Sequence, residues 1–314
     1  MRYGAPLTTV LVPLDGSWRS EAALVPAVPL ALRTGARLVL LSTQWSASDL
    51  GTTRNYLEGR RAGLFDMGFD GQCGIEAVIE RDAAAAIVAA AAEPGTLVCM
   101  ATHGHGGVIR GVLGSVAEAV VRTAVAPVVL VGPSLDPHWR LPPIPARPEI
   151  VVALDGSPTA REAIPAAISL ARAIDADVRL VHVPHPDQLA VDEWGPVLAT
   201  FAEAGIAVSV EFVDGFDPAA ALADVAAEGR VAFLVAATHG RTGLARVTLG
   251  SVVQRLVRRA PCPVFVVRPT VLTEVPRSGD GQVGATTEEA AHARRGWRRG
   301  RGRSQPSRSA APQG

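Results

Sequence analysis

Two copies of one motif contain residues whose spacing suits phosphate binding. The stretch ATHGHGGVIRGVLGSV stands at 101–116, and a close copy, ATHGRTGLARVTLGSV, stands at 237–252. In each copy a Thr-His-Gly triplet is followed ten residues later by Gly-Ser. Gly104 and Gly240 allow the backbone to adopt a positive φ and to approach a ligand closely. We therefore expect both glycines to lie in loops against a bound molecule.

The Gly-Ser pairs are placed to begin helices. Gly114 with Ser115, and Gly250 with Ser251, precede segments of helical period. At such a start the serine can cap, and free amides point outward with the positive end of the helix dipole, which makes an anion site. All 30 basic residues of the chain are arginine, so no P-loop lysine exists. Glycines and Gly-Ser pairs are also common at loop ends and helix starts for conformational reasons alone, but two copies with one spacing favour phosphate.

An aspartate ends the first apolar run of each copy. Asp15 lies in LVPLDGS and Asp155 in VVALDGS. In an open parallel sheet, ligands bind outside the carboxyl ends of the strands, so these carboxylates and the glycine loops belong on one rim. There they can accept a hydrogen bond from a ribose hydroxyl or approach a metal on the phosphates.

The elements that must position these residues repeat as well. TTVLVPLDGSWRSEAAL at 8–24 matches EIVVALDGSPTAREAI at 149–164. Short apolar runs predict strands, and longer periodic segments between them predict helices. Their alternating order predicts an α/β fold of two tandem open parallel five-stranded sheets flanked by helices, Rossmann-like or flavodoxin-like. The predicted strands are 8–14, 37–43, 75–79, 96–101, 127–131, 149–154, 177–183, 206–213, 231–237 and 263–267; the predicted helices are 19–34, 82–93, 114–124, 158–174, 218–228 and 250–260. Pro26 and Pro29 predict a kink or an early break in the first helix.

The pattern divides the chain into four parts. We expect a first domain over 1–132, a proline-rich linker over 133–147, a second domain over 148–269 and an Arg-rich tail over 270–314. The tail holds 8 Arg against 4 acidic residues and is expected to be disordered.

These motifs together resemble the universal stress protein family in its tandem two-domain form. The resemblance lies in Asp-Gly-Ser after the first strand, a glycine motif of the form G-x2-G-x9-G-S, and a terminal Pro-Val-(x)-Val-Val strand, over roughly 1–132 and 148–268. Here Ala101 and Ala237 replace the first glycine of the motif. The resemblance implies an adenine nucleotide alpha hydrolase-like sheet that binds ATP, with Mg2+, without strong catalysis. It also implies pairing through the last strands, as an intramolecular pseudo-dimer of 127–131 with 263–267, with a further homodimer as a second option.

The resemblance assigns roles to individual residues. Asp15 and Asp155 would contact the nucleoside, and Thr43 and Val183, which end the second strands, would contact adenine by backbone. The phosphates would be held by Gly104, Gly114 and Ser115, and by Gly240, Gly250 and Ser251.

Other polar residues of the motif permit alternatives. His103 and His105 form a His-x-His pair, but no third ligand at suitable spacing is evident, so rim histidines, like His239, are favoured over a metal site. Arg110 and Arg241 can reach a γ-phosphate or lie on the solvated surface.

Composition limits the remaining function classes. Hydrophobic residues make up 48% of the chain, and no apolar run reaches the length of a membrane span, so we expect a cytoplasmic protein without a membrane partner. Aromatic residues are scarce at 4%, which makes nucleic acid an unexpected partner except through the tail. The three cysteines, Cys73, Cys99 and Cys262, lack metal-ligand spacing and are expected to be buried thiols; Cys99 and Cys262 lie in or beside apolar runs.

Three functions agree with these features. The first is an ATP-binding regulatory protein that acts on an unknown protein partner in a stress response. Strong catalysis is not expected, because no nucleophile, base and acid stand at a spacing suited to turnover. The second is a slow ATPase or nucleotidyl-transfer enzyme. The third is an interaction protein that never binds nucleotide, with Ala101 and Ala237 marking lost sites.

Overall fold

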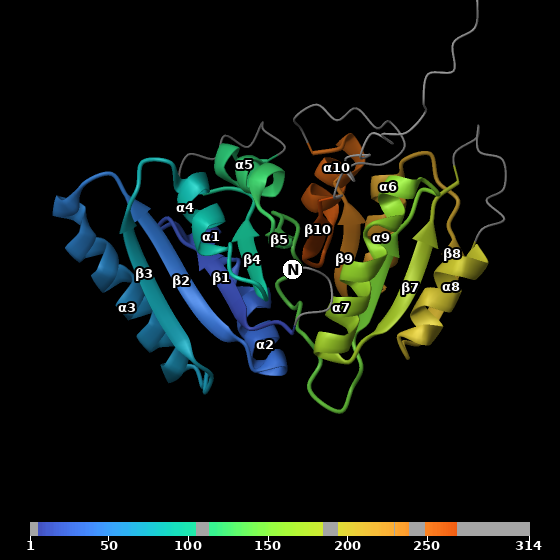
Figure 1. Ribbon diagram of the computed structural model, residues 1–314, viewed down its shortest axis with the longest axis horizontal. Helices are drawn as coiled ribbons and strands as arrows, with labels where there is room; N and C mark the ends of the chain where they lie inside the picture. The colour runs from blue at the N-terminus through green and yellow to red at the C-terminus, as the bar shows by residue number, and fades with distance from the viewer. Residues whose placement is uncertain (1–5, 105–112, 185–193, 229, 239–248, 269–314) are drawn as a thin grey trace, which may run out of the picture. The chain divides into compact units, whose positions relative to one another are not determined.

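A computed structural model of the chain describes residues 6–104, 113–184, 194–228, 230–238 and 249–268 (Figure 1). These residues lie within the compact unit Met1–Thr270. The predicted tail, 270–314, lies outside the described residues. Among the described helices, none is both long enough and apolar enough to cross a bilayer.

The described strands form one ten-stranded sheet. Its order is β3-β2-β1-β4-β5-β10-β9-β6-β7-β8, and every pair is parallel except β5 with β10. The strands are β1 Thr9–Pro13, β2 Arg37–Gln44, β3 Cys73–Ile79, β4 Thr96–Ala101, β5 Val128–Val131, β6 Glu149–Ala153, β7 Asp177–His182, β8 Val208–Phe212, β9 Val231–Ala237 and β10 Val264–Val267. The predicted α/β class is therefore confirmed, and the two five-stranded parallel sheets are halves of one larger sheet.

Antiparallel pairing of β5 with β10 joins the two halves, as expected for 127–131 and 263–267. The register sets Leu130 opposite Val264 and Val128 opposite Val266. All residues of both strands are buried. Each half would otherwise expose an apolar strand edge, which invites pairing with another chain, so this contact removes two edges at once.

Helices cover both faces of the sheet (Figure 1). Buried side chains of α2, α3, α7 and α8 pack on one face, and those of α4, α5, α9 and α10 pack on the other. The helices are α1 Trp18–Glu21, α2 Leu24–Thr34, α3 Leu50–Asp66, α4 Ala83–Ala90, α5 Ser115–Thr123, α6 Pro158–Arg161, α7 Ile164–Ile174, α8 Trp194–Glu203, α9 Pro218–Ala226 and α10 Ser251–Arg259, with a short 3-10 turn, η1, at Ala47–Asp49. Because both faces are covered, central strands such as β4 and β9 are buried almost throughout, which explains their continuous apolar sequences.

The helix predicted over 19–34 is interrupted, but the interruption does not fall at its prolines. The interruption falls at Ala22–Ala23, before Pro26 and Pro29, and both prolines remain within α2. Pro26 stands in the first turn, where its missing N–H has no intrahelical acceptor. The second half has the same interruption, between α6 and α7, so the break belongs to the fold.

Sequence patterning missed α3 and α8. The apolar residues of α3, LGTTRNYLEGRRAGLFD, show almost no helical period, and only Thr53, Leu57 and Leu64 are buried. Tyr56 fixes this helix to α1, because its hydroxyl donates to Glu21 at 2.9 Å. Burial and this neighbouring carboxylate raise the pKa of Tyr56 well above its usual range.

The expectation of buried thiols holds for Cys99 and Cys262, whereas Cys73 on β3 is half-buried. Burial raises the pKa of all three thiols, that of Cys262 to about 12. Cys99 and Cys262 are side chains of the core.

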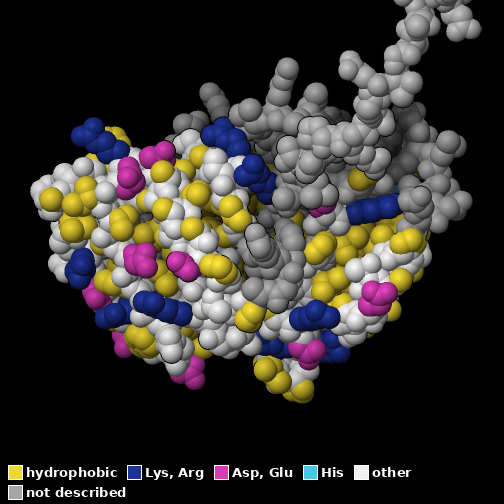
Figure 2. Space-filling model, in the orientation of Figure 1, with side chains coloured by type: hydrophobic (Ala, Val, Ile, Leu, Met, Phe, Trp, Pro, Cys, Tyr) yellow, Lys and Arg dark blue, Asp and Glu magenta, His cyan; other side chains and the backbone are white. Residues whose placement is uncertain are grey.

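The surface carries mixed charge. On the face drawn in Figure 2, Arg, Asp and Glu side chains of the described residues are scattered among hydrophobic ones. The described residues that this view shows form no continuous basic area of the kind that binds nucleic acid through its phosphates.

The linker is held between the halves by two long side chains. The guanidinium of Arg33, at the end of α2, donates to the carbonyls of Ile174 at 3.0 Å, Pro142 at 3.1 Å and Ala146 at 3.3 Å. The indole N–H of Trp139 donates to the Ala232 carbonyl at 3.1 Å. Arg33 therefore connects the first half, the linker and the last turn of α7.

We expect Arg33→Ala to lower the free energy of unfolding by about 1–3 kcal/mol, because three carbonyls lose a charged donor. Urea denaturation followed by circular dichroism measures the change. Arg54→Ala, at an exposed arginine of α3, is the control and should shift stability by less than about 0.5 kcal/mol. Equal stability of the two variants would show that Arg33 does not hold the halves together.

Candidate functional site

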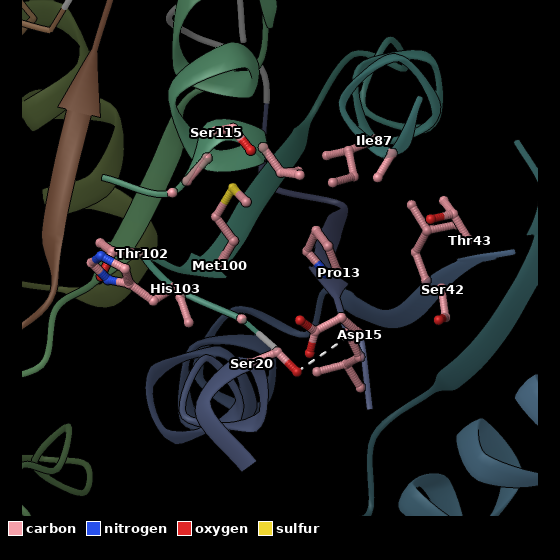
Figure 3. Close-up of a pocket in the computed structure, with 18 of the residues that line it drawn as sticks. Pro13, Asp15, Ser20, Ser42, Thr43, Ile87, Met100, Thr102, His103 and Ser115 are labelled. Carbon is pink, nitrogen blue, oxygen red and sulfur yellow. Dashed lines mark hydrogen bonds between the residues drawn. The ribbon is translucent and has the colours of Figure 1, made fainter. Parts of the chain in front are cut away.

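A cavity of about 650 Å³ opens at the carboxyl ends of β1, β2 and β4 in the first half (Figure 3). This volume is typical of small-molecule sites. Three of the segments that line it, 13–15, 41–45 and 100–104, end or follow these strands, and the others belong to α1, α4 and the start of α5. The five first-half residues predicted from the motifs and the family resemblance all line it: Asp15, Thr43, Gly104, Gly114 and Ser115.

The Asp-Gly-Ser turn fixes the Asp15 carboxylate. Its Oδ1 accepts from the Ser17 N–H at 2.9 Å and from the Ser17 hydroxyl at 2.6 Å. The same hydroxyl caps α1 by accepting from the Ser20 N–H at 3.1 Å. Gly16 has a φ of 85°, a left-handed backbone conformation that residues other than glycine rarely adopt. The sequence Asp-Gly-Ser thus turns the chain and orients the acid in one step.

Gly104 is needed for a different reason from the one predicted. Its φ is not in the left-handed region; instead, a Cβ there would collide with Oδ2 of Asp15. The glycine therefore allows the loop after β4 to approach the carboxylate after β1. The prediction of positive φ was wrong for Gly104, and Gly240 lies outside the described residues.

Close backbone contact sets the start of α5. The Gly114 N–H donates to the Thr102 carbonyl at 2.8 Å, and a Cβ on Gly114 would lie 2.8 Å from that oxygen. Gly114 is the N-cap, so the expectation that Ser115 caps the helix was wrong. Ser115 instead occupies the first helical position, exposed, where its hydroxyl faces the cavity mouth (Figure 3).

The second half repeats these contacts. Asp155 Oδ1 accepts from the Ser157 N–H at 2.9 Å and from its hydroxyl at 2.6 Å. The Gly250 N–H donates to the Thr238 carbonyl at 2.8 Å, and Ser251 begins α10 without a side-chain cap. The described geometry of the two motifs is therefore the same.

The two ends of the first cavity differ in character. In the view of Figure 3, Thr43 and Ser42 lie at one end, and Ser115 and His103 lie at the other, with Asp15 between them. Apolar side chains of Leu41, Ile87 and Met100 also line the cavity, and sequence reasoning missed them because their periodicity marked them only as core. The cavity thus offers an apolar wall and a polar, amide-rich end to one ligand.

The two halves differ at one pair of residues near the end of the second strand. On the first sheet Ser42 pairs with Ala77, whereas on the second sheet His182 pairs with Phe212. The His182 ring is buried, its Nδ1 lies 2.8 Å from the Leu154 carbonyl, and both rings stack edge-on with Trp194 at centroid distances of 5.7–5.9 Å. Val183, predicted to contact a base, follows this cluster and is buried.

The histidine of the first motif is tied to its neighbour. His103 Nδ1 lies 2.9 Å from the Thr102 hydroxyl. In the part of the chain that the structure describes, no three His, Cys, Asp or Glu side chains are grouped to hold a metal ion. His105, Arg110, His239 and Arg241 lie outside the described residues.

We expect Gly104→Ala to lower the free energy of unfolding by about 1 kcal/mol, because the Asp15 carboxylate must leave its bonds to Ser17 to make room. A double-mutant cycle with Asp15→Ala tests the cause: removing the carboxylate should cancel most of the cost of the added methyl. Additive losses of stability in the double variant would contradict this contact.

Comparison with known proteins agrees with this architecture. The family model described as Universal stress protein family matches residues 6–132 and 147–268. A universal stress protein of Methanocaldococcus jannaschii is 30% identical over 139 residues, which cover 38% of this chain and 81% of that protein. One from Mycobacterium tuberculosis H37Rv is 31% identical over 187 residues, and the alignment covers 55% of this chain and 61% of that relative.

A solved universal stress protein from Archaeoglobus fulgidus has the same fold. It superposes with a TM-score of 0.58 at 19% identity and covers 83% of this chain and 96% of its own. The two family matches stand in tandem, one on each half of the sheet. The chain therefore belongs to the universal stress protein family, in its tandem two-domain form.

Proposed function

We propose that the chain is a regulatory protein of the stress response that binds ATP, as its Mg2+ complex, in the first-half cavity. One observation carries the proposal: five residues chosen from the motifs and the family resemblance, on four separate segments, line a single cavity of ligand size. The residues that line the cavity suit each part of such a ligand, from the phosphates to the base.

The phosphate end consists of backbone. The start of α5 lines the cavity through Ser115, Val116 and Ala117, and the first amides of a helix have no intrahelical acceptor. These donors and the helix dipole favour negative charge. A Cβ on Gly104 would meet Asp15, and one on Gly114 would meet the Thr102 carbonyl, so both glycines let the loop after β4 and the start of α5 close around the phosphates. A site made of backbone amides needs no lysine.

The nucleoside end consists of side chains from β1, β2 and α4. Asp15 is held by Ser17 in an orientation suited to accept hydrogen bonds from ribose hydroxyls. Beyond it, Ile87 and Leu41 offer apolar surface to a base, and the main chain at Thr43 offers the hydrogen-bonding groups. Since no described cluster of ligands holds a metal by itself, we expect Mg2+ to enter bound to the triphosphate.

A regulatory role follows from what the cavity contacts. The Asp15 carboxylate accepts from the Ser17 hydroxyl, and His103 Nδ1 lies 2.9 Å from the Thr102 hydroxyl. Binding acts on the segment 101–104, whose Thr102 N–H is bonded to Val131 on β5. Through that segment, occupancy alters the surface offered to a protein partner.

The second half is proposed to bind a second nucleotide. Asp155, Gly250 and Ser251 repeat the geometry of the first site, and Val183 takes the place of Thr43. Gly240, which would complete the phosphate loop, lies outside the described residues.

The test is to denature freshly purified protein, identify any released nucleotide by chromatography, and titrate the emptied protein with MgATP by calorimetry. We expect adenine nucleotide at one or two per chain. Gly114→Ala should weaken the first site at least about tenfold, because its Cβ meets the Thr102 carbonyl and moves the amides of α5.

Gly59→Ala in α3 is the matched control, because a Cβ there meets nothing within 4 Å. It should bind as the unaltered protein does. Neither release nor heat would show an interaction protein without nucleotide, and magnesium-dependent phosphate release that Gly114→Ala abolishes would show a slow ATPase.

A further inference from the structure

An exposed tryptophan stands at the mouth of the first-half cavity. Trp45 follows directly after β2 and is one of the residues that line the cavity, yet 76% of its surface is exposed. A side chain that both lines a cavity and faces solvent lies at its entrance. Thr43 and Gln44, the last residues of β2, place the indole at the nucleoside end of the site.

Most of the Trp45 indole is open to solvent. The other strongly exposed tryptophan of the first half, Trp18, is 74% exposed, but the guanidinium of Arg19 lies 4.9 Å from its ring centroid. Among the described residues, no aromatic ring or guanidinium stacks on Trp45 in this way. A large flat apolar surface is therefore left open beside a ligand-sized space.

We propose that Trp45 stacks on the base of the bound nucleotide and closes the entrance of the cavity over it. This inference rests on the proposed function and adds a residue that binds the base. The π-face of an indole accepts any nucleobase, and stacking of this kind contributes strongly to nucleotide affinity. A purine covers more of the ring than a pyrimidine does, so Trp45 favours purine nucleotides.

The two halves are unequal at this position. The β1–β2 and β6–β7 registers align Thr43 with Val183. In the sequence the second half has His185, which lies outside the described residues, at the position that corresponds to Trp45, so the chain has no second tryptophan there and we expect loss of Trp45 to affect one site.

The experiment compares the full chain with Trp45→Ala, Trp45→Phe and Trp18→Ala, by calorimetric titration with MgATP and with Mg2+-tripolyphosphate, which has no base. We expect Trp45→Ala to lose about 5- to 100-fold in ATP affinity at one site and Trp45→Phe to lose much less. Trp18→Ala should bind ATP unchanged, because Trp18 does not line the cavity. Tripolyphosphate affinity should be the same for all four proteins.

The outcomes separate this inference from the function on which it rests. ATP binding that is unchanged in Trp45→Ala would overturn the stacking role while leaving the nucleotide site intact. Equal loss of ATP and tripolyphosphate affinity would also overturn it, because the defect would then be general. Absence of ATP binding in the unaltered protein would overturn both proposals. Emission from Trp45, taken as the difference between the unaltered protein and Trp45→Phe, should change on addition of ATP.

Discussion

Antiparallel pairing of β5 with β10 is the contact on which the architecture depends. Each half is a parallel sheet whose last strand would otherwise end in an open, wholly apolar edge. Pairing Leu130 with Val264 and Val128 with Val266 continues the sheet across the junction. The two helical layers then cover one uninterrupted surface, and Trp139 and Arg33 hold the linker against both halves. The junction strands also bond to the motifs, since the Thr102 N–H donates to Val131 on β5 and the Thr238 N–H donates to Val267 on β10, so the junction helps to position both rims.

Within each rim, the chemistry depends on how closely separate segments approach one another. Asp15 is oriented by Ser17 and touches the loop after β4, where only a glycine fits. That loop in turn holds the start of α5 through the Thr102 carbonyl. Three chain segments thus meet around the Asp15 side chain, and all three line the cavity.

Much of this was predictable from residue order. The apolar runs predicted all ten strands, because a strand covered on both faces has a continuous apolar sequence. The paired motifs identified Asp15, Gly104 and Gly114 as neighbours, since the carboxyl ends of parallel strands share one rim. The helix α3 was missed, because its sequence shows almost no apolar period. The role of Gly104 was misjudged, because the collision it avoids is with a residue 89 positions away. Neither the extent of the cavity nor the exposure of Trp45 could be read from sequence, since both depend on packing between distant segments.

The first half pairs Ser42 with Ala77, whereas the second half pairs His182 with Phe212. This difference is possible because the two domains are parts of one chain. Two identical subunits joined through the same strands would carry identical rims, and any substitution would appear in both. Covalent fusion removes that symmetry: one half has Ser42 and Ala77 at these positions, and the other sets a buried His182 against Phe212 and Trp194. The two halves of a single chain can therefore differ beside their rims, as the two subunits of a heterodimer can.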